Sequence, residues 1–295
     1  MRFAFFQTGR SASSEETRTI EVAVQAGEAW LDTAALDLDF ELRPETLLAL
    51  GAAEHAAIAH AARRSHATVD LATVTLLPPV APTARIFCVG LNYADHADES
   101  AMARPAHPVI FLRTLDSFVG ADAPLVKPRA SDAFDYEGEM VAVLGSGGRR
   151  IAPSDAARHI AAYTICNEGS VRDYQLERGP QWTMGKNFAA SGALGPWLVT
   201  ADEVPLLGKG LAIETRINGE RLQAANTDQM IFDLPAIIAY LSEAFVLRAG
   251  DVIVSGTPSG VGFARKPPRF MQVGDQVEVA IAGLGTLRNT VVAED

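Results

Sequence analysis

Residues 135–143 read DYEGEMVAV, and this stretch decides how the chain folds. Its second half is apolar and β-branched, which predicts a β-strand. Side chains at positions i and i+2 of a strand share a face, so we expect Glu137 and Glu139 side by side. Two such carboxylates repel unless a cation joins them, and hard divalent ions prefer oxygen ligands. The alternative is a strand whose polar face lies in solvent.

Further apolar runs on both sides of this stretch, bounded by Gly, Asn or Pro, predict more strands. They are 2–7, 21–24, 86–89, 109–112, 140–144, 162–166, 212–217, 252–254, 277–281 and 286–292. The sequence RINGERL (216–222) predicts a hairpin that turns at Asn218-Gly219. Predicted helices are few: 43–65 with Pro44 near its start, 153–160 and 234–244. Many strands with few helices indicate a β-rich α+β fold rather than a doubly wound parallel sheet.

A proline-rich segment divides the chain. Residues 76–85 read LLPPVAPTAR, and its three prolines favour extended structure. We therefore predict a small N-terminal domain over 1–75, a linker over 76–84 and a second domain over 85–295.

Composition excludes several classes of protein. The 295 residues carry a net charge of −11, which argues against a partner that is a nucleic acid or an anionic membrane surface. Hydrophobic residues make up 48%, so global disorder is excluded, and no apolar run is long enough to span a membrane. The two cysteines, Cys88 and Cys166, lie in apolar runs and are expected to be buried and reduced. We expect a cytoplasmic protein.

A third acidic residue and several polar ones follow the run at 162–166. Glu168 comes directly after it, and Arg172, Gln175 and Lys186 follow within a short span. Arg grips carboxylates in a bidentate manner and Lys supplies a compact charge, so this set suits an anionic, oxygen-rich ligand on a metal ion. The alternative is a surface loop with ordinary ion pairs.

A separate pair, His96 and Glu99, follows the strand predicted at 86–89. Residues three apart share a helix face. A Glu that accepts from one imidazole nitrogen fixes the tautomer and strengthens the other nitrogen as a base. The alternative is a helix-surface ion pair.

Six motifs in order resemble the fumarylacetoacetate hydrolase family over roughly residues 85–292. They are GLNYADHADE (90–99), YEGEMVAVLG (136–145), NEGSVRDYQ (167–175), WTMGKNF (182–188), GDVIVSGTPSGVG (250–262) and GDQVEVAIAGLG (274–285). The chain departs from the family pattern at Glu168, where Asp is usual, at Gly169, where Val is usual, and at Ser255, where Thr is common. The resemblance implies a mixed β-sandwich roll with a smaller N-terminal domain, assembled as a homodimer.

The resemblance also implies roles for individual residues. Glu137, Glu139 and Glu168 match the ligands of Mg²⁺ or Mn²⁺, with Ca²⁺ as a further candidate. His96 and Glu99 match a dyad on a lid, here about 92–105, that is found in the hydrolases of the family. Lys186 matches a catalytic position. Arg172, Gln175 and Thr257 match substrate-contacting positions.

The expected reaction is metal-dependent hydrolysis of a C–C bond in acylpyruvates or related 2,4-diketo acids, including diketo-deoxy sugar acids. His96, oriented by Glu99, would activate water, and Lys186 and Gln175 would stabilise the oxyanion. The same site would also serve a decarboxylase, isomerase or hydratase of 2-oxo acids. A silent metal and ligand binder is the third alternative.

Overall fold

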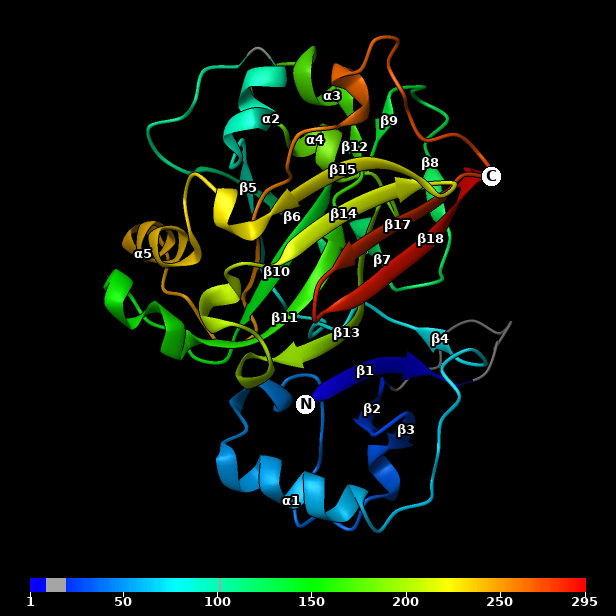
Figure 1. Ribbon diagram of the computed structural model, residues 1–295, viewed down its shortest axis with the longest axis vertical. Coiled ribbons are helices and arrows are strands. Elements are labelled where there is room, and N and C mark those ends of the chain that lie inside the picture. The colour runs from blue at the N-terminus through cyan, green and yellow to red at the C-terminus, as the bar shows by residue number, and fades with distance from the viewer. Residues whose placement is uncertain (9–19, 101) are drawn as a thin grey trace.

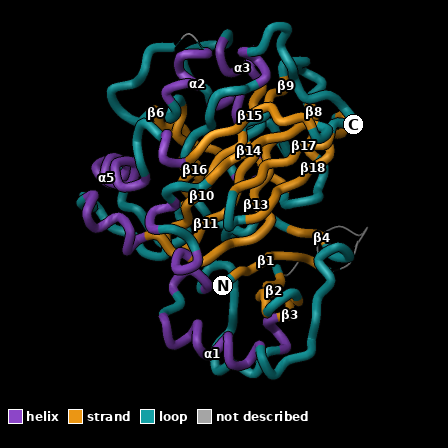
Figure 2. The backbone as a smooth tube through the Cα atoms, in the orientation of Figure 1, coloured by secondary structure: helices purple, strands orange, loops and turns teal. Residues whose placement is uncertain are grey.

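The computed structural model describes residues 1–8, 20–100 and 102–295. Most of its ordered structure is strand, arranged in two large sheets that face each other (Figures 1 and 2). The β-rich α+β fold predicted from the sequence is confirmed. Position 101, within the expected lid, lies outside the described residues.

The larger sheet combines strands from both halves of the chain. From edge to edge it contains β3 (Ala29–Asp32), β2 (Glu21–Ala26), β1 (Arg2–Gln7), β13 (Gly192–Thr200), β11 (Ile160–Asn167), β10 (Gly138–Leu144), β16 (Val252–Val254), β5 (Ile86–Gly90) and β6 (Val109–Arg113), with β4 (Thr75–Leu76) on β1 and β7 (Phe118–Val119) on β13. β1 pairs antiparallel with β13, so the N-terminal strands extend this sheet. The division into domains at 76–84 stays a prediction.

The second sheet packs across the first. Its order is β15 (Glu220–Asn226), β14 (Ala212–Ile217), β17 (Gln276–Ile281), β18 (Gly285–Ala293) and β8 (Leu125–Lys127). The predicted hairpin joins β14 to β15, with Asn218 at φ 51° and Gly219 at φ 83°. Positive φ at both turn residues is what a two-residue hairpin of type I′ requires. A short pair, β9 (Phe134–Asp135) with β12 (Ser170–Val171), completes the strands of the described residues.

Five α-helices lie around the sheets in the described part of the chain (Figure 1). They are α1 (Ala52–Ala62), α2 (Ala94–Glu99), α3 (Arg172–Leu176), α4 (Thr183–Lys186) and α5 (Leu234–Ala244). The described residues also form short 3₁₀ helices at Thr33–Ala35, Leu47–Ala49, Leu115–Ser117, Pro153–His159, Ala201–Glu203, Leu206–Gly208, Thr227–Gln229 and Gly262–Ala264. Figure 1 shows α2, α3 and α4 grouped at the end of the molecule opposite α1. No helix among the described residues has the length and apolar character needed to cross a membrane.

The helix expected over 43–65 is wrong in its extent. It begins only at Ala52, and the 3₁₀ turn Leu47–Ala49 is separate from it. The break is at Gly51, whose backbone is extended and whose N–H donates to the Glu54 side chain at 3.0 Å. This contact caps the first turn, so a single helix does not run through. The helix predicted over 153–160 forms as a 3₁₀ helix over Pro153–His159.

Both faces of β10 are covered. Met140, Ala142 and Leu144 pack into the core between the two sheets, whereas Val141 and Val143 pack into a second core on the opposite face. That second core also contains Cys88 and Cys166, which are buried free thiols as predicted. Glu137 and Glu139 share the face of Val141 and Val143 by strand alternation. The alternative of a strand with its polar face in solvent is therefore excluded.

Candidate functional site

Strand register brings three carboxylates together. β10 and β11 are antiparallel, with Gly138 opposite Asn167 and Glu139 opposite Cys166. The Glu168 N–H donates to the Glu137 carbonyl at 2.8 Å, which extends the pairing by one residue. Directly opposed residues of an antiparallel pair share a face, so all three glutamates point to the same side.

The three side chains form a compact, buried acidic cluster. Glu137, Glu139 and Glu168 are 4%, 1% and 1% exposed. One carboxylate oxygen from each lies within 4.8 Å of the others. Such a cluster is costly without compensating positive charge, because burial and mutual repulsion both disfavour ionised carboxylates.

Two buried cations supply part of that charge. The Lys186 Nζ lies 2.6 Å from Glu137 and 2.9 Å from Glu168. The Arg172 Nη1 lies 2.7 Å from Glu137. The alternative of a surface loop with ordinary ion pairs is therefore excluded, since these pairs are buried. The Lys186 ammonium is thus engaged by two carboxylates, whereas a group that stabilises a substrate oxyanion must be free to donate to the substrate.

The cations stabilise the acids unequally. Burial alone would raise the pKa of Glu137, but the charges of Lys186, Arg172 and His96 lower it to about 2. Burial, together with the charges of Glu168 and Glu137, holds the pKa of Glu139 well above its ordinary value. Burial would lower the pKa of Lys186, but Glu137 and Glu168 outweigh it and raise that pKa. The positive charge in the pocket therefore favours ionisation of Glu137 over ionisation of Glu139.

The residues fit a divalent cation at this place. The Glu168 Oε1 is buried and has no hydrogen-bond partner among the described residues, which leaves one ligand atom unused. Counting Asp135, four buried carboxylates face two buried cations, so an ion of charge +2 would neutralise the cluster. An all-oxygen donor set is what Mg²⁺ and Mn²⁺ prefer.

Asp135 holds Arg172 in place, a role that sequence reasoning missed. Its carboxylate accepts from the Arg172 Nε at 2.8 Å and from the backbone N–H groups of Gly262 and Phe263. The Arg172 guanidinium also lies over the Phe263 ring. Its Nη2 is buried and has no partner among the described residues. The only feature of the sequence that pointed to this role was the position of Asp135, two residues before Glu137 on the same predicted strand face.

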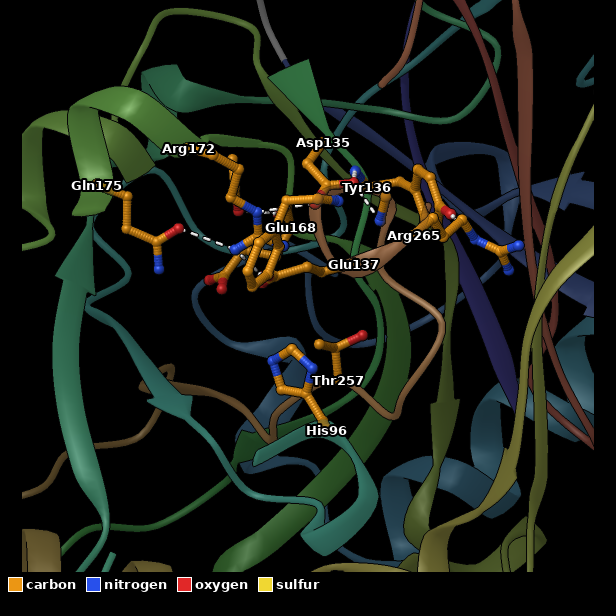
Figure 3. A network of polar contacts seen from close by, with 12 residues as sticks. His96, Asp135, Tyr136, Glu137, Glu168, Arg172, Gln175, Thr257 and Arg265 are labelled. Carbon is orange, nitrogen blue, oxygen red and sulfur yellow. Dashed lines mark hydrogen bonds and ion pairs between the residues drawn. The ribbon is translucent and has the colours of Figure 1, made fainter. Parts of the chain in front are cut away.

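His96 and Glu99 lie on α2 and form the expected pair. The His96 Nδ1 is 3.0 Å from the Glu99 Oε1. Glu99 also accepts from the Gly260 N–H at 3.0 and 2.9 Å, so its carboxylate is held by the loop after β16. This contact is buried on the imidazole side, unlike a helix-surface ion pair. In Figure 3, His96 and Thr257 face Glu137 and Glu168 from the opposite side of a gap.

One cavity collects nearly all of the candidate residues. Its lining includes His96, Glu137, Glu139, Glu168, Arg172, Gln175, Lys186 and Thr257. Glu99 is the exception, since it lies behind His96. The Gln175 Oε1 accepts from Arg172 at 2.8 Å. The cavity measures about 20 Å³, which is room for about one water molecule, so a substrate enters only if the surrounding segments move.

The structure explains the departure at Gly169. A Cβ at this position would lie 1.8 Å from the Ser191 carbonyl oxygen, so the Val usual in the family does not fit. The Gly169 carbonyl accepts from the buried Arg113. Close approach of the two backbones, rather than a positive φ, therefore requires glycine here.

Replacing Gly169 with Ala is expected to lower the free energy of unfolding by about 3 kcal/mol, because the backbone must move to admit the methyl group. Urea unfolding followed by circular dichroism measures this. Gly148→Ala is the matched control, since the three atoms nearest to a Cβ there are side-chain carbons, of Ile151 at 3.2 and 3.3 Å and of His159 at 3.8 Å. Equal losses in the two variants would contradict the steric account.

Known proteins are similar to this chain in sequence and in fold. The chain is 36% identical over 293 residues to the Xenopus laevis protein named oxaloacetate tautomerase fahd2, mitochondrial, covering 99% of this chain and 90% of that protein. The solved structure of fumarylacetoacetate hydrolase from Exiguobacterium antarcticum has a TM-score of 0.77 and 32% identity over all of both chains. Fumarylpyruvate hydrolase from Pseudomonas aeruginosa, solved with Mn²⁺ and pyruvate, has a TM-score of 0.66 and 33% identity, covering 75% of this chain and 92% of that one.

The profile of the fumarylacetoacetate (FAA) hydrolase C-terminal domain matches residues 85–292. This range contains every residue of the acidic cluster and of the His96–Glu99 pair. Taken with the shared architecture, it shows that the chain belongs to the fumarylacetoacetate hydrolase family.

Proposed function

We propose that this protein is a divalent-metal-dependent enzyme that interconverts the keto and enol forms of oxaloacetate or a closely related 2-oxo diacid. The observation that carries the proposal is the pairing of Lys186 with Glu137 and Glu168, in a pocket that also holds a buried imidazole oriented by Glu99. Enolisation needs one base and a site that stabilises negative charge. Lys186, which hydrolysis would use as an oxyanion donor, is instead engaged by Glu137 and Glu168. The relative named as an oxaloacetate tautomerase supports this reading.

Glu137, Glu139 and Glu168 would hold Mg²⁺ or Mn²⁺. When bound, the ion would supply Lewis-acid polarisation of the substrate's carboxylate and 2-oxo group. Side chains of the protein itself would bind the substrate and transfer the proton. The Nη2 of Arg172, which has no partner in the described part of the chain, would donate to a substrate carboxylate, and the geometry of an Arg–carboxylate pair would orient the substrate.

His96 carries the proton in this scheme. Because the Glu99 carboxylate fixes the Nδ1–H, the Nε2 is the basic nitrogen. It takes a proton from C3 as the C2–C3 double bond forms, and the resulting imidazolium returns that proton to the 2-oxo oxygen, so the product is the enol, with no net change in composition and with His96 neutral again. Positioned proton transfer of this kind contributes about 10²–10⁴-fold to rate.

The test is the decay of the enol absorbance of freshly dissolved oxaloacetate, followed with Mg²⁺ or Mn²⁺ and with a chelator. We expect the protein to accelerate the decay only when the metal is present. Release of pyruvate is measured in the same samples with lactate dehydrogenase. Metal-dependent decay without matching pyruvate supports tautomerisation, and no acceleration over buffer contradicts it.

Hydrolysis of acylpyruvates or other 2,4-diketo acids is the second candidate. The His96–Glu99 pair favours it, because the same base could activate water, and a similar protein is named fumarylpyruvate hydrolase. The assay is loss of acetylpyruvate or fumarylpyruvate with one pyruvate formed per molecule consumed. Metal-dependent cleavage would favour the hydrolase over the tautomerase.

Glu99→Gln is expected to lower kcat at least about 10-fold, because an amide can present its NH₂ group to His96 and reverse the tautomer. The measurement is the rate of enol decay at saturating oxaloacetate. Asp98→Asn, a carboxylate-to-amide change on the exposed side of α2, is the matched control. A kcat equal in both variants would show that Glu99 does not orient the base.

Assembly and location also belong to this proposal. We propose that the protein works as a homodimer in the cytoplasm on a small keto acid. The exposed apolar side chains Leu112 on β6 and Met184 on α4 offer a surface that a second copy would cover. A single-protomer mass by light scattering would contradict the dimer.

A further inference from the structure

Gly138 lies between Glu137 and Glu139, at a point where β10 no longer pairs with β16. On this edge the ladder to β16 ends with Val141 opposite Val254. The Ser255 N–H still donates to the Met140 carbonyl at 3.0 Å. Residues two apart on a strand direct their backbone groups to the same edge, so the N–H and C=O of Gly138 face the place where β16 would have continued. Buried backbone groups require partners.

Two side chains replace the missing strand. The Gly138 N–H donates to the Gln223 Oε1 at 3.0 Å, and the Gly138 carbonyl accepts from the Thr257 Oγ1 at 3.0 Å. The Gln223 Nε2 in turn donates to the Thr257 Oγ1 at 2.8 Å, which closes a ring of three hydrogen bonds. The same nitrogen also donates to the Pro258 carbonyl at 2.8 Å.

Gln223 reaches this ring from the other sheet. It lies on β15 and is 1% exposed. The sheets approach closely here, since a Cβ on Gly138 would lie 2.1 Å from the Thr215 Oγ1 and 3.4 Å from the Gln223 Oε1. A single buried amide thus joins β10, the second sheet and the loop after β16.

That loop carries two further contacts to the site. The Gly256 N–H donates to the Glu139 carboxylate, and the Gly260 N–H donates to Glu99. The ring therefore fixes the Gly138 backbone relative to the loop after β16. That loop in turn holds the carboxylates of Glu139 and Glu99.

We propose that Gln223 is a positioning residue for the metal site, acting through Gly138 and Thr257 rather than by touching metal or substrate. The inference rests on the proposed function, because it requires a metal ion at Glu137, Glu139 and Glu168. Partners one step behind metal ligands typically change metal affinity or activity by about 10–100-fold when they are removed. A purely structural glutamine would change stability and leave the metal affinity of the folded protein unaltered.

The test is Mn²⁺ binding, measured by calorimetric titration of the full chain and by the electron paramagnetic resonance signal of free Mn²⁺. Gln223→Met keeps the side-chain volume and removes all three hydrogen bonds of the amide. We expect its Kd for Mn²⁺ to rise about 10–100-fold. Gln276→Met, the same change at an exposed position of β17, is the matched control and should bind like the wild type.

Thr257→Val tests the ring from its other side and serves if Gln223→Met does not fold. If both residues act through one ring, the double variant binds Mn²⁺ no more weakly than the weaker single variant. Additive losses would contradict the ring. Wild-type affinity in Gln223→Met would overturn this inference alone, whereas no Mn²⁺ binding by the wild type would overturn both the inference and the proposed function.

Discussion

Replacing His96 with Gln is expected to lower kcat for oxaloacetate tautomerisation by about 10²–10⁴-fold and to leave Mn²⁺ affinity unchanged. The amide cannot take up the C3 proton, whereas the three glutamates and their hydrogen bonds stay in place. The measurement is the enol decay rate at saturating substrate, with Mn²⁺ binding measured on the same preparation.

His60→Gln is the matched control, because His60 is exposed on α1, far from the site in the fold (Figure 1). It should retain wild-type rates. If His96→Gln retained them as well, the imidazole would have no part in proton transfer.

Replacing Lys186 with Met is expected to lower the free energy of unfolding of the metal-free protein by about 3–5 kcal/mol. The change leaves Glu137 and Glu168 buried without the ammonium that lies 2.6 and 2.9 Å from them. Urea unfolding in the presence of a chelator measures the loss. Added Mg²⁺ should restore part of it, because a divalent ion held by the same carboxylates replaces the missing charge.

Lys209→Met is the control for this experiment, since Lys209 is half exposed and its Nζ lies 3.6 Å from Asp233. Surface pairs of this kind contribute about 0–1 kcal/mol. A Lys186 variant as stable as this control would mean that the acidic cluster does not depend on the buried ammonium.

Local patterns predicted the elements that local physics determines. The apolar, β-branched second half of 135–143 predicted the strand, the two-residue period of a strand predicted the common face of Glu137 and Glu139, and Asn218-Gly219 predicted the hairpin. The motifs also identified most of the residues that line the cavity of the candidate site. The helix expected over 43–65 was wrong in its extent, because composition does not reveal that Gly51 adopts an extended backbone.

Contacts between distant segments could not be predicted. The role of Asp135 depends on Arg172, 37 residues away, and that of Gln223 depends on Gly138, 85 residues away. The departure at Gly169 depends on the Ser191 backbone, which packs against it and is not evident from the residues around Gly169 in the sequence. Lys186 was expected to contact substrate, and only the fold shows that it balances the charge of two glutamates.

The central claim is that His96 moves a proton at C3 of a 2-oxo acid bound beside a metal ion. Exchange of the C3 protons of 2-oxoglutarate, a 2-oxo diacid, with D₂O, followed by proton nuclear magnetic resonance, tests it most directly. The account predicts that the wild type with Mg²⁺ or Mn²⁺ accelerates loss of the C3 methylene signal, and that a chelator or His96→Gln abolishes the acceleration. Exchange no faster than in protein-free buffer, at saturating diacid and metal, would contradict the account.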